Sequence, residues 1–160
     1  MPIPPHVTDF WATYAKAVGG VDESRFYEVF FFGDSQELAD SLVKLVLAGV
    51  KRATAGSLWS FEAEGKRLPQ PGDLSIVTNW AGTPLCVIET VAVDVVPFSE
   101  VTAEFAATEG EGDGSLAVWH EEHRQYFTRE CARMGRLFTE DLLVACECFR
   151  VVFQPSNSAV

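Results

Sequence analysis

Five short runs rich in β-branched and aromatic residues constrain the fold of this chain most strongly. They span residues 27–32, 52–59, 74–78, 85–96 and 142–153. Turn-forming segments separate some of them, such as Leu68–Asp73, which holds two prolines and a glycine, and Trp80–Pro84. Runs of this kind joined by short turns are typical of antiparallel strands. The sequence therefore predicts a sheet that is mainly antiparallel.

Helical patterns precede and interrupt these runs. Apolar residues recur at helical spacing from about Asp9 to Val18, and again between a cap at Asp34 or Ser35 and Gly49. A short helix is expected after Ser99 and a long one over about 115–134. Helices grouped before and within an antiparallel sheet indicate the α+β class. We expect one domain of 160 residues, a small β-barrel of five or six strands with peripheral helices.

The charge balance disfavours a long polyanion as ligand. The net charge is −11, with 12 Lys and Arg against 23 Asp and Glu, and the stretch Leu68–His123 contains ten acids and no Lys or Arg. Binding a nucleic-acid backbone depends on basic side chains that neutralise phosphates. A small basic patch near Lys51, Arg52, Lys66 and Arg67 stays possible, so the composition favours a small-molecule substrate without excluding RNA.

The cysteines and the N-terminal residues indicate the cellular compartment in which the protein is expected. Cys86, Cys131, Cys146 and Cys148 form no CxxC pair, and Met1 is not followed by a basic and then an apolar stretch. No apolar run is long enough to span a bilayer. We therefore expect reduced cysteines in the cytoplasm, no membrane partner, no disulfide, no structural zinc and no cofactor.

The first candidate for chemistry lies where the second helix gives way to a strand. Lys51 and Thr54 follow Gly49 closely, and a lysine beside a hydroxyl is a recognised activation pair, with a desolvated amine poised as a base. The alternative is an ordinary helix end followed by exposed charges. Glu89 is a second candidate, because a carboxylate within an apolar strand must be paired if it faces inward. Lys51 is its natural partner, unless Glu89 points to solvent.

The third candidate is a glycine-rich acidic loop, Gly110–Gly114, and the helix after it. Asp113 or Ser115 can cap this helix, whose N-terminus suits an anion. Trp119, His123 and Tyr126 are spaced to line one face, which could stack a base or pack in the core. His120 and His123 could share a metal, but HExxH is absent and the chain has three histidines, so we expect no bound metal.

Several motifs together resemble the ASCH family, a branch of the PUA-like superfamily. They are Phe32-Gly-Asp-Ser35 before a helix, Gly49-x-Lys51-x-x-Thr54, Pro71-Gly-Asp73, Val87-x-Glu89, and Glu111 through His123 to Phe127. The last segment is similar to the longer bacterial branch. The likeness covers about residues 26–153. It implies a PUA-like barrel with a cleft beside the GxKxxT loop.

The resemblance also implies an activity. Small family members remove the acyl group from N4-acetylated cytidine with a Lys, Thr and Glu constellation, which Lys51, Thr54 and Glu89 would supply here as catalytic residues. The expected substrate-binding residues are Arg52, Ser57, Asp113, Ser115, Trp119, His123 and Tyr126. The expected partner is a modified nucleoside or nucleotide, or a short RNA. Two alternatives stay open: an RNA-binding module or metal-assisted ribonuclease acting on single strands, and a non-catalytic nucleotide sensor.

Overall fold

A computed structural model describes residues 2–155, which form two compact units. Of the described residues, the first unit contains 2–50, 70–91 and 149–155, and the second contains 51–69 and 92–148. Neither unit is continuous in sequence. Two long strands, β4 (Pro84–Pro97) and β5 (Leu143–Phe153), each contribute residues to both units.

The first unit is built on strands covered by helices. Its other elements are η1 (Pro5–Val7), α1 (Thr8–Ala17), η2 (Glu23–Arg25), β1 (Phe26–Phe30), α2 (Gln36–Leu47) and β3 (Leu74–Thr78). Ser35 caps α2 by accepting a hydrogen bond from the backbone N–H of Leu38. Gly49, with φ 78°, follows the helix end in the left-handed conformation expected there.

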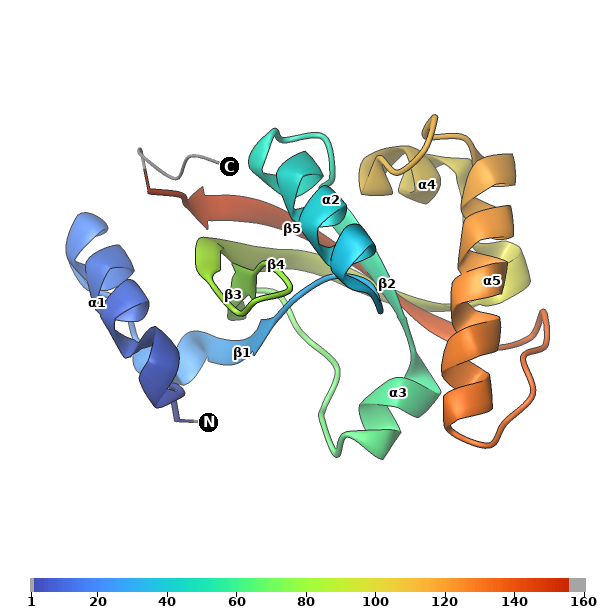
Figure 1. The fold of residues 1–160 in the computed structure, drawn as a ribbon, viewed down its shortest axis with the longest axis horizontal. Helices are drawn as coiled ribbons and strands as arrows, with labels where there is room; N and C mark the ends of the chain where they lie inside the picture. The colour runs from blue at the N-terminus through green and yellow to red at the C-terminus, as the bar shows by residue number, and fades with distance from the viewer. Residues whose placement is uncertain (1, 156–160) are drawn as a thin grey trace. The chain divides into compact units, whose positions relative to one another are not determined.

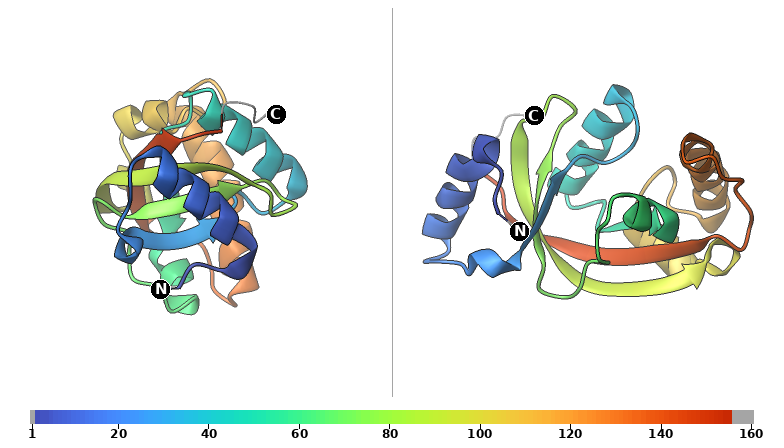
Figure 2. Two further views of the ribbon diagram at one scale, coloured as in Figure 1. Left: turned by 90° about the vertical axis from the view of Figure 1, so that its left-hand side faces the viewer. Right: turned by 90° about the horizontal axis from the view of Figure 1, so that it is seen from below.

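Strand β3 is buried over its whole length because a helix covers each of its faces. Leu74 and Ile76 pack in one cluster with Trp11 of α1, whereas Val77 packs in another with Val43 of α2. Alternate residues of a strand point to opposite faces, which explains the division. The right-hand view of Figure 2 shows α1 and α2 on opposite sides of these strands.

The pairing of β1 departs from the mainly antiparallel arrangement expected of the sheet, which the pairings of β3 with β4 and of β2 (Ala53–Ser57) with β5 follow. Phe26–Phe30 pairs in parallel with Leu74–Thr78, while β3 with β4, and β2 with β5, are antiparallel. The chain between β1 and β3 contains two helices and a strand, so it is long enough for the crossover that parallel strands require.

The described residues of the second unit form two short and two longer helical segments. They are α3 (Leu58–Ala63), η3 (Phe98–Glu100), α4 (Ala103–Glu109) and α5 (Leu116–Arg133). Figure 1 shows α4 and α5 as neighbours within this unit. Its core includes Phe98, Trp119, Phe127 and Val144. The run from residue 52 to 59 is extended only as far as Ser57, because the Ser57 hydroxyl caps α3, which the sequence analysis missed.

The described strands form an open sheet in the order β1-β3-β4-β5-β2. The α+β class is confirmed, whereas closure into a barrel is not seen, because β1 and β2 are the two ends of this order. Among the described residues, no helix combines the length and apolarity needed to cross a membrane.

Candidate functional site

A buried lysine lies at the centre of a polar cluster in the second unit. Lys51 directly precedes β2, and its side chain is 1% exposed. Its Nζ donates to the carbonyl oxygen of Ala53 at 2.7 Å, to Glu109 Oε2 at 3.0 Å and to Glu111 Oε2 at 2.7 Å. A buried ammonium is costly unless it is paired and hydrogen-bonded, and these partners meet that need.

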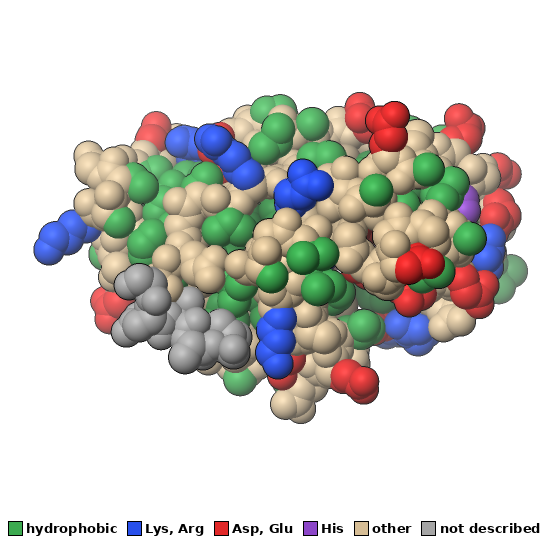
Figure 3. Space-filling model, turned by 90° about the horizontal axis from the view of Figure 1, so that it is seen from above, with side chains coloured by type: hydrophobic (Ala, Val, Ile, Leu, Met, Phe, Trp, Pro, Cys, Tyr) green, Lys and Arg blue, Asp and Glu red, His purple; other side chains and the backbone are tan. Residues whose placement is uncertain are grey.

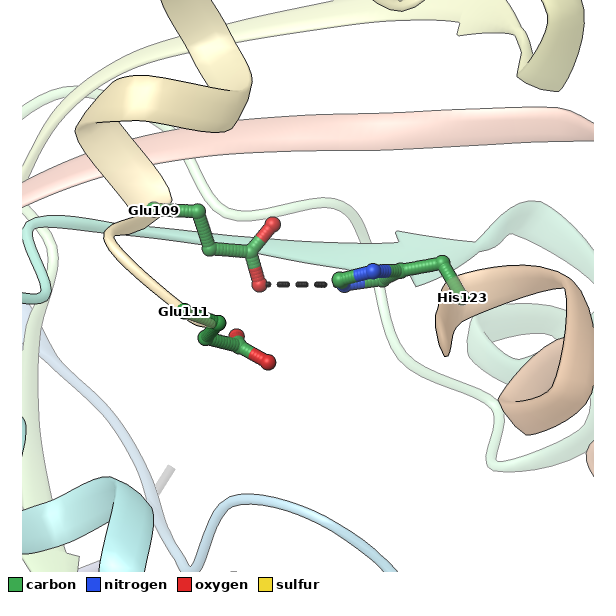
Figure 4. Close-up of side chains that lie close together, drawn as sticks. All are labelled: Glu109, Glu111 and His123. Carbon is green, nitrogen blue, oxygen red and sulfur yellow. Dashed lines mark hydrogen bonds and ion pairs between the residues drawn. The ribbon is translucent and has the colours of Figure 1, made fainter. Parts of the chain in front are cut away.

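Glycines at two positions bring both carboxylates to Lys51. Gly110 ends α4 in the left-handed conformation, with φ 69°, and separates Glu109 from Glu111. Gly112 has φ 60°, and a Cβ built there would lie 2.7 Å from Cγ1 of Val118. A side chain at Gly112 would therefore be strained and would clash with α5. Figure 4 shows Glu109 and Glu111 reaching the site from this turn.

Helix α5 supplies two aromatic rings that fix Glu109. Trp119 and His123 are one helical turn apart and stack with a ring-centroid distance of 4.0 Å and an interplanar angle of 10°. Trp119 Nε1 donates to Glu109 Oε1 at 2.6 Å, and His123 Nε2 lies 3.2 Å from Glu109 Oε2. The Glu109 side chain is 2% exposed, so its carboxylate is enclosed by these donors.

The surroundings of His123 favour the imidazolium form. Nδ1 lies 2.9 Å from the carbonyl oxygen of Trp119, which can only accept a hydrogen bond, and Nε2 faces the Glu109 carboxylate. Both ring nitrogens therefore need a proton. Burial lowers the pKa of His123, but the hydrogen bond to Glu109 and the charges of Glu109 and Glu111 outweigh it and raise that pKa.

Lys51 is held in its charged form. Burial lowers the pKa of Lys51, but the charges of Glu109 and Glu111 more than offset this effect and raise it above the usual value. An ammonium donates hydrogen bonds and stabilises negative charge, but it cannot accept a proton. The base role expected for Lys51 is thus disfavoured, because its two carboxylates oppose the desolvation on which that expectation rested.

The two glutamates differ in their protonation. Burial opposes the ionisation of Glu109, but Lys51 and the hydrogen bond from His123 lower its pKa well below the usual range. Burial raises the pKa of Glu111 to about 7, against the effect of Lys51 and with a further contribution from the hydrogen bond to Glu109. Glu111 is therefore poised to give and take a proton near neutral pH.

The same side chains present oxygen and nitrogen atoms of the kind that bind metals. One such atom from each of Glu109, Glu111 and His123 lies within 4.8 Å of the others. However, the Lys51 ammonium binds both carboxylates, and the favoured imidazolium form of His123 has no lone pair to offer. The cation of this site is therefore Lys51, and we assign no metal to it.

The predicted residues of β2 have separate environments. Ala55 packs against the core of the second unit, so strand alternation places the half-buried Thr54 on the opposite face. Ser57 is fully buried, and its hydroxyl donates to Glu130 Oε1 at 2.7 Å, which ties β2 to α5. The Arg52 side chain is exposed, while its backbone N–H donates to the carbonyl oxygen of Thr108.

The predicted residues of the acidic loop and α5 form the start and the inner face of that helix. Ser115 caps α5 by accepting from the N–H of Val118, and Asp113 is exposed and accepts from the N–H of Ser115. Tyr126 is half-buried against the core. Trp119 is 3% exposed between His123 and Phe98, so neither face is open to a base, and the expected stacking platform is corrected to a core residue.

Glu89 does not form the expected ion pair with Lys51. It belongs to the first unit, where its carboxylate pairs with Arg25 at 3.2 Å and Arg150 at 2.8 Å. The lysine instead pairs with Glu109 and Glu111. The sequence analysis missed Glu109 altogether and chose Asp113 from the acidic loop rather than Glu111. The available signal was a pair of glutamates flanking a glycine at the end of a helix.

Lys51 is buried, so it does not contribute to the basic surface patch that the sequence analysis considered. Lys66 pairs with Glu64 at 3.3 Å, and Arg67 donates to the carbonyl oxygen of Leu68. On the face drawn in Figure 3, Lys and Arg side chains are scattered among Asp and Glu. Burial raises the pKa of the Cys146 thiol to about 12, so this cysteine is no candidate nucleophile.

The raised pKa of Glu111 predicts a specific dependence of stability on pH. Because its pKa is about 7 in the folded protein and ordinarily 4.5, its stabilising contribution is complete below about pH 4.5 and is lost as the pH rises through 7. Relative to Glu111→Gln, the wild type should therefore lose roughly 1–3 kcal/mol of unfolding free energy between pH 5 and pH 8. Urea denaturation across this range measures the difference.

His123 titrates in both the wild type and Glu111→Gln, and Glu111 is one of several groups that raise its pKa, so the difference between the two proteins reports mainly on Glu111. The control is Glu104→Gln, which removes an exposed carboxylate from the first turn of α4. It should leave the pH dependence of the wild type unchanged. A difference between wild type and Glu111→Gln that stays constant from pH 5 to pH 8 would contradict the assignment.

Comparisons with known proteins agree with this architecture. The family model of the ASCH domain matches residues 28–153. The crystal structure of an ASCH domain from Lactobacillus crispatus JV V101 is 34% identical, with a TM-score of 0.84, and the match covers 96% of this chain and 98% of that one. A protein from Enterococcus faecalis V583 is 33% identical, with a TM-score of 0.83, and the match covers 91% and 87% of the two chains. No curated protein matches the chain.

Proposed function

Because the chain belongs to the ASCH domain family, we propose that it is a hydrolase of modified nucleosides, with N4-acylated cytidine as the leading substrate. The observation that carries the proposal is the buried cluster of Lys51, Glu109 and Glu111. It combines a fixed ammonium with a carboxyl group whose pKa is about 7. Such a pair suits amide hydrolysis, which needs both oxyanion stabilisation and proton transfer.

The proposed roles follow from the charges of the groups. The nucleophile is assigned to Thr54 from the ASCH resemblance alone, because strand alternation turns its side chain to the face of β2 opposite Ala55. In this assignment Thr54 attacks the amide carbonyl, and Lys51 stabilises the oxyanion that forms. Glu111 delivers a proton to the leaving nitrogen and regains one from the threonine hydroxyl, so that the C–N bond breaks and an ester remains. Water then hydrolyses the ester and releases the acyl group as a carboxylic acid. Glu111 thus replaces Glu89 as the catalytic glutamate in this proposal.

In this proposal a substrate reaches Lys51 when Glu111 moves away. Lys51 is 1% exposed, and Glu111, which binds its Nζ at 2.7 Å, is the more exposed of its two carboxylates at 15% against 2% for Glu109. The flanking Gly110 and Gly112 give the Glu111 backbone room to rotate. A neutral substrate carbonyl is the natural replacement for the Glu111 carboxylate on Lys51. A phosphate would add a negative charge beside Glu109, which favours a nucleoside over a nucleotide.

The test is turnover of acylated nucleosides by the purified protein. N4-acetylcytidine, longer N4-acylcytidines and a short single-stranded RNA are incubated with and without a chelator, and products are separated chromatographically. We expect deacylation of a nucleoside that neither chelator nor moderate salt changes. Thr54→Val and Glu111→Gln should each lower kcat/KM about 100-fold or more.

Matched variants and substrates make the result interpretable. Thr13→Val alters an exposed threonine of α1 and should keep full activity. Cleavage of the RNA that stops on adding chelator would instead support a metal-assisted ribonuclease. RNA binding with a steep salt dependence and no turnover would support a binding module. Turnover unaffected by Thr54→Val would remove Thr54 as the nucleophile.

A further inference from the structure

We propose that Glu109 is a positioning residue that anchors the ammonium of Lys51 and keeps the negative charge of the carboxyl pair, so that the exchangeable proton stays on Glu111. This inference rests on the proposed function, in which Glu111 delivers a proton to the leaving nitrogen. It gives Glu109 no contact with the substrate. Three observations carry it: the donors around Glu109, the exposure of the two glutamates, and the groups that face them.

Glu109 has the stronger set of hydrogen-bond donors. Oε1 accepts from Trp119 at 2.6 Å, and Oε2 accepts from Lys51 at 3.0 Å and faces His123 Nε2 at 3.2 Å. Two of these donors carry positive charge, and all three are buried. Hydrogen bonds between ionised partners are about twice as strong as those between neutral ones. Protonation of Glu109 would weaken all three contacts together.

Glu111 stands in a weaker and more open position. Its carboxylate accepts from Lys51 at 2.7 Å, and its side chain is 15% exposed against 2% for Glu109. Two adjacent carboxyl groups in a buried site do not both ionise readily, so one keeps a proton near neutral pH. The member with fewer charged donors and access to solvent, Glu111, is the one that holds and exchanges it.

The other groups around the pair do not reverse this preference. Lys51 stands before β2, and α5 contributes His123; both face Glu109 at hydrogen-bond distance, and their raised pKa favours the cationic form of each. Strand β5 contributes Cys146 and Cys148, and burial is the main cause that raises the pKa of both thiols, so they face Glu109 uncharged. Lys51 and His123 therefore favour the ionised form of Glu109, and the two thiols add no charge that opposes it.

Glu109→Gln tests the proposal without requiring activity. The substitution keeps the shape of the side chain and removes its charge, so of this carboxylate pair only Glu111 still faces Lys51. The titration midpoint of Glu111, measured from its carboxyl carbon by NMR and assigned with Glu111→Gln, should fall by at least one pH unit. If Glu111 acts as the acid, kcat/KM at pH 7 should fall at least tenfold and recover towards pH 5.

Trp119→Phe provides a second variant that retains the Glu109 carboxylate. It removes one donor to Glu109 and keeps an aromatic ring on His123. The Glu109 carboxyl carbon should then show part of the titration step near pH 7 that belongs to Glu111 alone in the wild type. Glu104→Gln, on the same helix as Glu109 and exposed, should alter neither titration nor pH profile.

The outcomes separate the two proposals. A wild type that turns over no nucleoside, but whose Glu111 midpoint falls in Glu109→Gln, refutes the proposed function and leaves the role of Glu109 standing. An active wild type with an unshifted Glu111 midpoint in folded Glu109→Gln refutes the role of Glu109. If Glu109→Gln does not fold, a wild type in which the carboxyl carbon of Glu109, rather than that of Glu111, shows the titration step near pH 7 refutes it equally.

Discussion

Replacing Lys51 with methionine is expected to destabilise the folded protein by about 3–5 kcal/mol at pH 7, because the change leaves buried carboxylates without their cation. Methionine fills a similar volume, so lost packing contributes little. Glu109 and Glu111 lie 3.0 and 2.7 Å from the Lys51 Nζ. Without it, the ionised form of Glu109 keeps only Trp119 and His123 as compensating donors among these contacts.

The pH dependence distinguishes the loss of charge from the loss of packing. Without Lys51, the pKa of the carboxyl groups rises, so the folded variant takes up protons and becomes relatively more stable as the pH falls. The deficit measured by urea denaturation should therefore shrink between pH 7 and pH 5. Lys66→Met removes a lysine from the more exposed pair with Glu64 and should cost below about 1 kcal/mol. A deficit for Lys51→Met no larger than that would refute the buried network.

Replacing Trp119 with alanine is expected to cost about 3–5 kcal/mol of stability, because the ring lies in the core of the second unit. It stacks on His123, lies 5.5 Å from the ring of Phe98 and bonds Glu109 through Nε1. The substitution opens a cavity and removes a donor from a buried carboxylate. Both effects act in the same direction, and chemical denaturation measures their sum.

Trp80→Ala makes the same chemical change at an exposed site. Trp80 is 41% exposed and contacts Phe31 with a centroid distance of 4.8 Å, so its loss should cost below about 1.5 kcal/mol. A Trp119→Ala protein of nearly wild-type stability, with nucleoside binding weakened tenfold or more, would restore the stacking platform expected from the sequence.

Local sequence patterns determined several elements of this chain. Strand β3 has the predicted bounds, 74–78, and α5 spans Leu116–Arg133 against about 115–134 expected. Each of the two predicted helix caps is the serine of its pair of candidates, Ser35 rather than Asp34 and Ser115 rather than Asp113. These features depend on periodicity and on hydrogen bonds between residues three or four apart, which a sequence displays directly. Motif spacing likewise identified the ASCH family before any fold was known.

Long-range pairing was decided only in the tertiary structure. The parallel pairing of β1 with β3 depends on how the two strands are brought together by the rest of the fold. The residues of either strand alone do not specify that partner. The partner of Lys51 was decided in the same way. Glu89 and Glu109 are both glutamates at a plausible distance in sequence, but the helix end at Gly110 brings Glu109 to the lysine.

The sequence by itself determined the class of fold, through its periodicity, and pointed to the family, through the resemblance that its short motifs carry. It also named Lys51 as a candidate site residue. Only the tertiary structure decided that Lys51 is an ammonium bound by Glu109 and Glu111, and that Trp119 faces the core. The physical reason is that a protonation state depends on burial and on charges within a few ångströms. Those charges come from Glu109 and Glu111, which lie 58 and 60 positions after Lys51 in the sequence.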